Sequence, residues 1–187
     1  GVDAITVHGR TAVQHYGGRA DWKWIERVKR ESSSPIIGNG DVQSLDQADR
    51  LLTETACDGI MIGRASMGNP WLLAAIADGW GRPCGLGAQF GWTDFWQTAH
   101  EHLVTFLGTA GRPLGHLKKL VVWYSKGCPG AGRLRAEVMA QQEVHGVLAR
   151  FGDWARQLND LGEPFCKVKV PGEAHSWSDV TVEDGTR

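Results

Sequence analysis

Three short segments of the sequence combine glycine with residues that can bind a phosphate group. They are His8-Gly9-Arg10, Gly38-Asn39-Gly40-Asp41 and Gly63-Arg64. Glycine lets backbone N–H groups approach an anion closely, and an arginine side chain can donate two parallel hydrogen bonds to phosphate oxygens. The three segments are therefore predicted to bind one anionic ligand together, provided that the fold brings them to the same place.

Each segment follows a short, apolar, β-branched run. The runs cover residues 4–7, 35–37 and 59–62. Such runs are typical of strands that are buried on both faces, as in a parallel sheet covered by helices. The alternation of strands with helical stretches predicts right-handed βαβ units, in which ligands bind at the carboxyl ends of the strands.

Two amphipathic helices are expected between the strands. Asp21 is suited to be the N-cap of a helix over residues 22–30, in which Ile25 and Val28 face the sheet. Ser44 and Gln47 form a capping-box pattern at the start of the second helix. The apolar stripe of that helix comprises Leu45, Ala48, Leu51 and Leu52.

The glycine pattern favours a barrel over an open doubly wound sheet. Gly38 and Gly40 lack the third glycine of a dinucleotide fingerprint, whereas paired phosphate loops after the last two strands are typical of a (β/α)₈ barrel. A complete barrel takes roughly 250 residues, so three strands cannot close one. Residues 1–82 are therefore predicted to be the last three βα units of a TIM barrel, within the carboxyl-terminal portion of a longer enzyme.

The second half of the sequence is predicted to be helical. A Gly-rich stretch over residues 83–91 marks the expected domain boundary, and residues 92–160 form the expected helical domain. Thr93 is the expected cap of its first helix, and a third helix is expected over residues 133–150. Apolar stripes in these helices are most simply core, namely Phe95, Ala99, Leu103, Phe106 and Leu107, then Leu117, Leu120, Val121 and Tyr124, then Leu134, Val138 and Leu148. Residues 161–187 give no amphipathic period and are read as a flexible tail.

Basic residues cluster in the helical half without intervening acids. No Asp or Glu occurs between Glu101 and Glu137, a stretch that suits a nucleic-acid backbone. An ordinary solvated helix face is the alternative, and the net charge of −1 gives no general support for nucleic-acid binding. The candidate RNA-binding residues are Lys118, Lys119, Lys126, Arg133 and Arg135.

The remaining composition narrows the class of protein. The 4 cysteines have no zinc-ligand spacing, so no metal site is predicted. No apolar stretch approaches membrane-spanning length and no secretory signal is present. We therefore expect a cytoplasmic protein with no membrane partner.

The motifs, taken in order, resemble the tRNA-dihydrouridine synthase family. The resemblance covers roughly residues 1–150 and implies a barrel that binds FMN at its mouth, followed by a helical domain. It also implies tRNA as substrate, reduction of uridine to dihydrouridine, and NADPH as the reductant; we expect the complete enzyme to be a monomer. The motifs are His8-Gly9-Arg10-Thr11, Gln14, Tyr16, Gly18, Ala20-Asp21-Trp22, Gly38-Asn39-Gly40-Asp41, Asp58-Gly59, Met61-Ile62-Gly63-Arg64 and Gly68-Asn69-Pro70-Trp71.

The resemblance implies a role for each segment at the strand ends. The segments Asn39-Gly40-Asp41 and Gly63-Arg64 would hold the phosphate or ribityl region of the flavin, and His8 would contact the flavin. Arg10 would lie near the substrate entrance, although it could instead pair with Asp41. The catalytic cysteine and a lysine near the flavin are expected in a preceding part of the enzyme, so no catalytic residue is assigned here.

Two other functions remain open. One is a different flavin- or phosphate-binding barrel that reduces or oxidises small molecules, which would have no use for the basic helices. The other is a noncatalytic RNA-binding or structural fragment.

Overall fold

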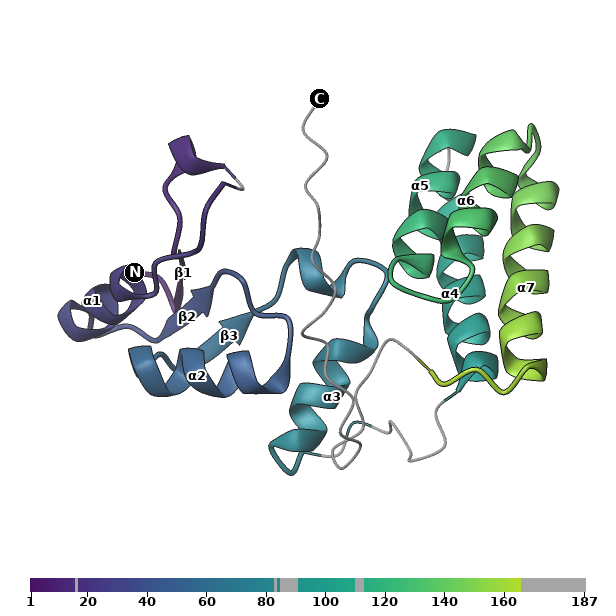
Figure 1. The fold of residues 1–187 in the computed structure, drawn as a ribbon. Helices are drawn as coiled ribbons and strands as arrows, with labels where there is room; N and C mark the ends of the chain where they lie inside the picture. Colours follow the sequence, from purple (N-terminus) through teal and green to yellow (C-terminus); the bar gives the residue numbers. More distant parts are fainter. Residues whose placement is uncertain (16, 83, 85–90, 110–112, 166–187) are drawn as a thin grey trace.

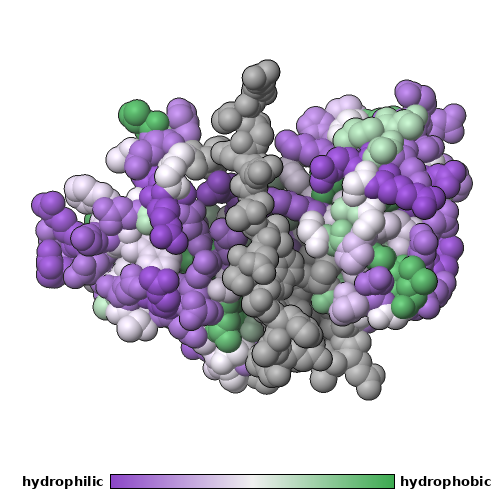
Figure 2. All heavy atoms as spheres, in the orientation of Figure 1, coloured by the Kyte–Doolittle hydropathy of each residue, from purple (hydrophilic) through white to green (hydrophobic). Residues whose placement is uncertain are grey.

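The computed structural model describes residues 1–15, 17–82, 84, 91–109 and 113–165. An α/β unit and a group of four helices lie at opposite ends of the molecule, with helix α3 (Trp71–Gly79) between them (Figure 1). Hydrophilic residues cover most of the α/β unit that is visible in Figure 2, and apolar surface is confined to separate patches. No helix in the described part of the chain is both long enough and apolar enough to cross a membrane.

The α/β unit is built on a parallel three-stranded sheet, as predicted. Strands β1 (Ile5–His8), β2 (Ile36–Asn39) and β3 (Gly59–Met61) lie in the order β1-β2-β3. In the register, His8 pairs with Asn39, and Asn39 pairs with Met61. The carboxyl ends of all three strands therefore lie side by side at one edge of the sheet.

Helices α1 (Lys23–Glu31) and α2 (Leu45–Thr55) pack on the sheet and on each other. Their core residues include Ile25, Ala48 and Leu51, all fully buried. Helix α1 begins one residue later than expected, because its N-cap is Trp22 and not Asp21. The Asp21 carboxylate still accepts a hydrogen bond from the Lys23 N–H at 3.1 Å. Only one of the two hydrogen bonds of the predicted capping box is present at the start of α2. Ser44 Oγ accepts from the Gln47 N–H at 3.2 Å, but Gln47 Oε1 accepts from the Gln43 N–H rather than from Ser44.

The prediction that the strands are buried on both faces is wrong for β1 and β3. Only β2 alternates buried and half-buried residues, whereas β1 is mostly exposed and Met61 of β3 is 51% exposed. The reason is that α1 and α2 cover a single face of the described sheet and that β1 and β3 are its edges. The uncovered face carries Thr6, His8, Asn39 and Met61, which share one side of the pleat.

A close backbone contact joins the α/β unit to the helices. Gly68, in the loop after the 3₁₀ turn η2 (Arg64–Ser66), has a φ of 69°. A Cβ at this position would overlap the backbone of Trp123 and lie 2.5 Å from the Tyr124 nitrogen. The following helix α3 has two sides, because Leu72 and Ile76 belong to the core of the α/β unit whereas Trp71 belongs to the core of the helices.

The helical part contains α4 (Trp92–Leu107), α5 (Leu114–Ser125), α6 (Ala131–Ala140) and α7 (Val144–Asp160). The predicted stripes supply much of its core. Phe95, Leu103, Leu117, Val121 and Leu134 are all buried there, and α4 packs along α7.

Two helix boundaries in this part differ from the predictions. Helix α4 begins at Trp92 with Gly91 as its N-cap, not at Thr93, because the Asp94 carboxylate accepts from the Gly91 N–H at 2.9 Å. The single helix predicted over residues 133–150 is two helices, α6 and α7. The chain turns between them through Gln141, which has a ψ of 142°, and this turn lets α7 lie against α4. The 3₁₀ turn η1 (Ala12–Gln14) completes the described elements. Most of the predicted boundary over residues 83–91, and the tail from residue 166 onward, lie outside the described residues.

Candidate anion-binding site

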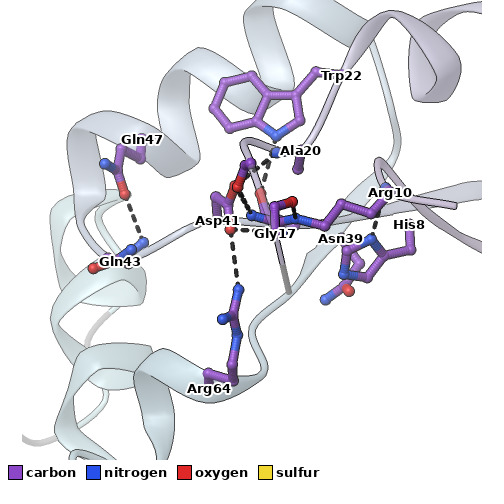
Figure 3. Close-up of polar contacts among 12 residues, drawn as sticks. His8, Arg10, Gly17, Ala20, Trp22, Asn39, Asp41, Gln43, Gln47 and Arg64 are labelled. Atoms are coloured by element: carbon purple, nitrogen blue, oxygen red, sulfur yellow. Dashed lines mark hydrogen bonds and ion pairs between the residues drawn. The ribbon is translucent and has the colours of Figure 1, made fainter. Parts of the chain in front are cut away.

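The polar residues that follow the strands come together at the carboxyl edge of the sheet, as Figure 3 shows. His8 Nδ1 accepts a hydrogen bond from the Arg10 N–H at 2.9 Å, which fixes the ring at the end of β1. Asn39 Nδ2 donates to the Met61 carbonyl at 2.7 Å and so ties the ends of β2 and β3 together. The segments predicted to act together are therefore neighbours in the fold.

Arg10 does not point into solvent. Its side chain is only 4% exposed, and it donates to both carboxylate oxygens of Asp41, at 2.8 and 2.7 Å. It also donates to the carbonyls of Gly17 and Gly18, at 3.2 and 2.6 Å. The structure thus contains the Arg10–Asp41 pair that was the alternative to a direct ligand role for Arg10, and a nearly buried guanidinium holds the loop before α1 in place.

Asp41 is the centre of this network. Besides Arg10, its carboxylate accepts from the Ala20 N–H at 2.7 Å and from Arg64 at 3.3 Å. Burial by itself would raise the pKa of Asp41. The hydrogen bonds from Arg10 and Ala20, and the charges of Arg10 and Arg64, outweigh burial and lower the pKa below its ordinary value. Asp41 is therefore ionised at neutral pH, and it gathers donors from the connection between β1 and α1 and from the loop after β3.

The backbone around Asp41 adopts conformations that few residues tolerate. Gly40 has a φ of 134° and Asp41 a φ of 59°. The Gly40 carbonyl accepts from the Trp22 indole N–H at 2.9 Å, and a Cβ on Gly40 would lie 2.7 Å from the Cβ of Ala20. Glycine is required at position 40 by this close approach, and Asp is among the few other residues that enter the left-handed region.

This edge of the sheet fits a phosphate group in its donor chemistry. Within the described part of the chain, the backbone N–H groups of Gly40 and Asp41 donate no hydrogen bond to another protein group. No described atom outside the neighbouring residues lies within 4 Å of the position of a Cβ on Gly63, so a ligand has room to approach that backbone. The side chain of Arg64 is 53% exposed beside it. Backbone N–H donors and an accessible guanidinium are the groups that bind phosphate in proteins.

A cavity of about 780 Å³ opens beside Asp41, on the side of α1 and α2. Its walls mix both signs of charge, and the Arg50 guanidinium lies 5.7 Å from the centre of the Trp22 ring. The cavity lining includes Arg10, Arg19, Lys23, Asp41, Arg50 and Arg64.

The five basic residues of the predicted RNA-binding surface lie on α5, on α6 and in the turn between them. Those two helices are in contact. Several of these residues also have partners within the protein. Lys118 donates to the Met139 carbonyl at 2.8 Å, Lys119 lies 4.9 Å from the centre of the Trp123 ring, and Arg133 pairs with Glu137 at 2.8 Å. The fold thus places these residues on two packed helices and their connecting turn, with the charge of Arg133 largely balanced by Glu137.

Several members of the network around Asp41 were not predicted from the sequence. These are the carbonyls of Gly17 and Gly18, the Ala20 N–H and the Trp22 indole. Backbone groups carry no signal in the residue types, but Gly18 and Trp22 both lie in motifs that the family resemblance had marked.

Comparison with known sequences identifies the family of this chain. A sequence model of the dihydrouridine synthase family matches residues 1–158. A probable tRNA-dihydrouridine synthase of Rickettsia prowazekii (strain Madrid E) is 32% identical over 168 residues, which are 87% of this chain and 50% of that protein. Probable tRNA-dihydrouridine synthase 1 of Synechocystis sp. is 38% identical over 149 residues, covering 77% of this chain and 41% of that protein.

The structure defines the chain as a parallel α/β unit with a polar edge at the carboxyl ends of its strands, followed by helices. Within this class of protein, the chain belongs to the dihydrouridine synthase family. It spans about half the length, or less, of the curated relatives that it matches.

Proposed function

We propose that this chain supplies the flavin-phosphate edge and the helical RNA-binding part of an FMN-dependent tRNA-dihydrouridine synthase. The observation that carries the proposal is the convergence of the loops after β1, β2 and β3 on Asp41 and Arg64 at one edge of a parallel sheet. Family membership supports the reaction class, which is an oxidoreductase acting on tRNA. NADPH is the proposed reductant, and the cytoplasm is the proposed location.

The proposed tasks of the residues are binding and orientation. The backbone of Gly40, Asp41, Gly63 and Arg64 binds the phosphate of FMN, together with the Arg64 guanidinium. His8 and Asn39 lie on the uncovered face of the sheet, where they orient the rest of the flavin. When bound, FMN supplies the hydride chemistry that reduces the C5–C6 bond of uracil.

The sheet is proposed to be the last three βα units of a (β/α)₈ barrel. Two features support this assignment, namely the edge position of β1 and β3 and the exposed face that carries Met61. In a closed barrel that face lines the interior, and further strands pair with both edges. The proton donor to uracil is then placed on other strands of the barrel, so these residues alone are proposed to be inactive.

The basic cluster on α5 and α6 is proposed to contact the tRNA backbone. The loop that contains Gly68 begins just after Arg64 and touches α5 at Trp123, so the two candidate sites are joined through one short segment. An RNA held by α5 and α6 is thereby directed toward the carboxyl edge of the sheet.

The full-length polypeptide provides the test. We expect it to purify with flavin absorbance, to oxidise NADPH, and to form dihydrouridine in unmodified tRNA, detected by mass spectrometry of nucleosides. Arg64→Gln is expected to lose bound FMN, whereas Arg27→Gln, on the solvent side of α1, serves as the matched control. NADPH oxidation with small enoyl compounds but not with tRNA would favour a small-molecule oxidoreductase instead. A protein that purifies without flavin absorbance and does not bind added FMN would refute the proposal.

A further inference from the structure

The carboxylate of Asp41 lies where a phosphate-binding site would ordinarily avoid negative charge. It stands 3.3 Å from the Arg64 guanidinium, whose side chain is half exposed. An anion beside a second anion is repulsive unless nearby cations compensate. The Asp41 side chain therefore needs a role other than direct contact with the phosphate.

The contacts of Arg10 supply that role. Arg10 neutralises Asp41 through two short parallel hydrogen bonds and is itself almost entirely buried. With Arg64 included, the group of three side chains keeps one net positive charge. Two hydrogen-bonded oxygens are also a rigid anchor for the residue that carries the left-handed φ of 59°.

Asp41 thus controls two things at once. Its bonds to Arg10 and to the Ala20 N–H anchor the Asp41 side chain and so restrain the unusual backbone of residues 40 and 41. The Asp41 carboxylate also accepts a hydrogen bond from Arg64, and this contact directs the Arg64 guanidinium toward the same place. Both effects concern the end of the site that would meet a phosphate, and neither concerns His8 and Asn39 on the uncovered face of the sheet.

We propose that Asp41 and Arg10 are positioning residues which act through Arg64 and the Gly40–Asp41 backbone, and that this pair sets the preference of the site for FMN over riboflavin. The inference rests on the proposed flavin site. It adds that the phosphate is recognised by donors held in place by a buried ion pair, with neither Arg10 nor the Asp41 carboxylate touching the ligand.

The test compares dissociation constants for FMN and riboflavin in the full-length protein, measured by quenching of flavin fluorescence. Asp41→Asn is the main variant, because Asn tolerates the left-handed backbone while the substitution removes the charge and one of the two acceptor oxygens. We expect D41N to weaken FMN about tenfold or more, while riboflavin changes by less than about twofold. Arg10→Gln should give the same selective loss, and the double variant should lose little more than either single one.

Arg27→Gln is the matched control. Arg27 is exposed on α1 and pairs with Glu31, and it makes none of the contacts around Asp41. The R27Q protein should keep the affinities of both flavins. If D41N and R10Q fail to fold, Arg64→Gln still tests the site, because the side chain of Arg64 is half exposed. The measured quantity is again the ratio of the dissociation constants for FMN and riboflavin.

Each other outcome overturns the inference. Equal weakening of FMN and riboflavin in D41N would mean a general structural role, and an unchanged or tighter FMN affinity would mean that Asp41 does not position donors. Retained preference for FMN in R64Q would break the link to Arg64. A wild-type protein that binds both flavins equally contradicts the inference while leaving the proposed function standing, whereas one that binds neither contradicts both.

Discussion

Gly68 lies where the loop after η2 meets the backbone of α5, and Gly68→Ala is the perturbation that tests this joint. Two costs are expected. With a φ of 69°, an alanine at this position is strained by about 1–2 kcal/mol. The added methyl group would also overlap the Trp123 carbonyl and lie 2.5 Å from the Tyr124 nitrogen. These are backbone atoms of a helix, so no side-chain rotation can relieve the overlap.

Overpacking of this kind costs about 1–3 kcal/mol, so the total loss in the free energy of unfolding should be about 2–5 kcal/mol. Gly81→Ala is the matched control. Gly81 has a φ of 68°, yet a Cβ there would meet no described atom within 4 Å. The G81A variant therefore carries the backbone strain without the overlap, and should lose only about 1–2 kcal/mol.

Urea denaturation of the three proteins measures both terms. The excess destabilisation of G68A over G81A isolates the contact between the loop and α5. An excess below about 0.5 kcal/mol would refute the close packing of Gly68 on α5. If the proposed function also holds, G68A should weaken tRNA binding more than flavin binding. The added methyl group would push α5 away from the loop and so move the helices relative to the sheet.

Three further outcomes are expected. Asp41 has a lowered pKa in the folded state, so the stability that its charge adds is present above its unfolded pKa of about 3.9 and is lost as the pH falls through the folded pKa. The free energies of unfolding of the wild type and D41N should therefore differ at about pH 6 and converge in acid. Burial raises the pKa of Tyr124 to about 12, and its hydroxyl lies 2.7 Å from His102 Nδ1, so Tyr124→Phe should cost about 1 kcal/mol near pH 7 in urea denaturation. Arg135→Gln on α6 should weaken tRNA binding and reduce the slope of log affinity against log salt by about one, whereas Arg156→Gln on α7 should leave that slope unchanged.

The strand order and the convergence of the loops followed from the sequence because both depend on local patterns. Apolar runs at residues 4–7, 35–37 and 59–62 fixed the positions of the strands. The rule that parallel strands end at one edge then brought His8, Asn39 and Arg64 together. The stripe of Leu117, Val121 and Tyr124 was equally readable, because helix periodicity alone places these residues on one face.

The burial of Arg10 and the break between α6 and α7 were not readable in the same way. Arg10 is enclosed by the carbonyls of Gly17 and Gly18, whose positions depend on the path of a whole loop. The break at Gln141 contains neither proline nor glycine, and it arises because α7 packs along α4. In both cases tertiary contacts override local propensity. Such contacts join residues that are far apart in the sequence, so no local pattern of residue types predicts them.

The segment from Arg64 to Trp71 connects the two halves of the proposed function mechanically. Arg64 pairs with Asp41 at the strand edge, Gly68 touches the backbone of α5, and Trp71 is buried among the helices. The segment is short: Ala65 packs against the core of the α/β unit, and Trp71 belongs to the core of the helices. One short stretch of backbone therefore connects the strand edge that is proposed to bind a phosphate with the helices that are proposed to bind RNA.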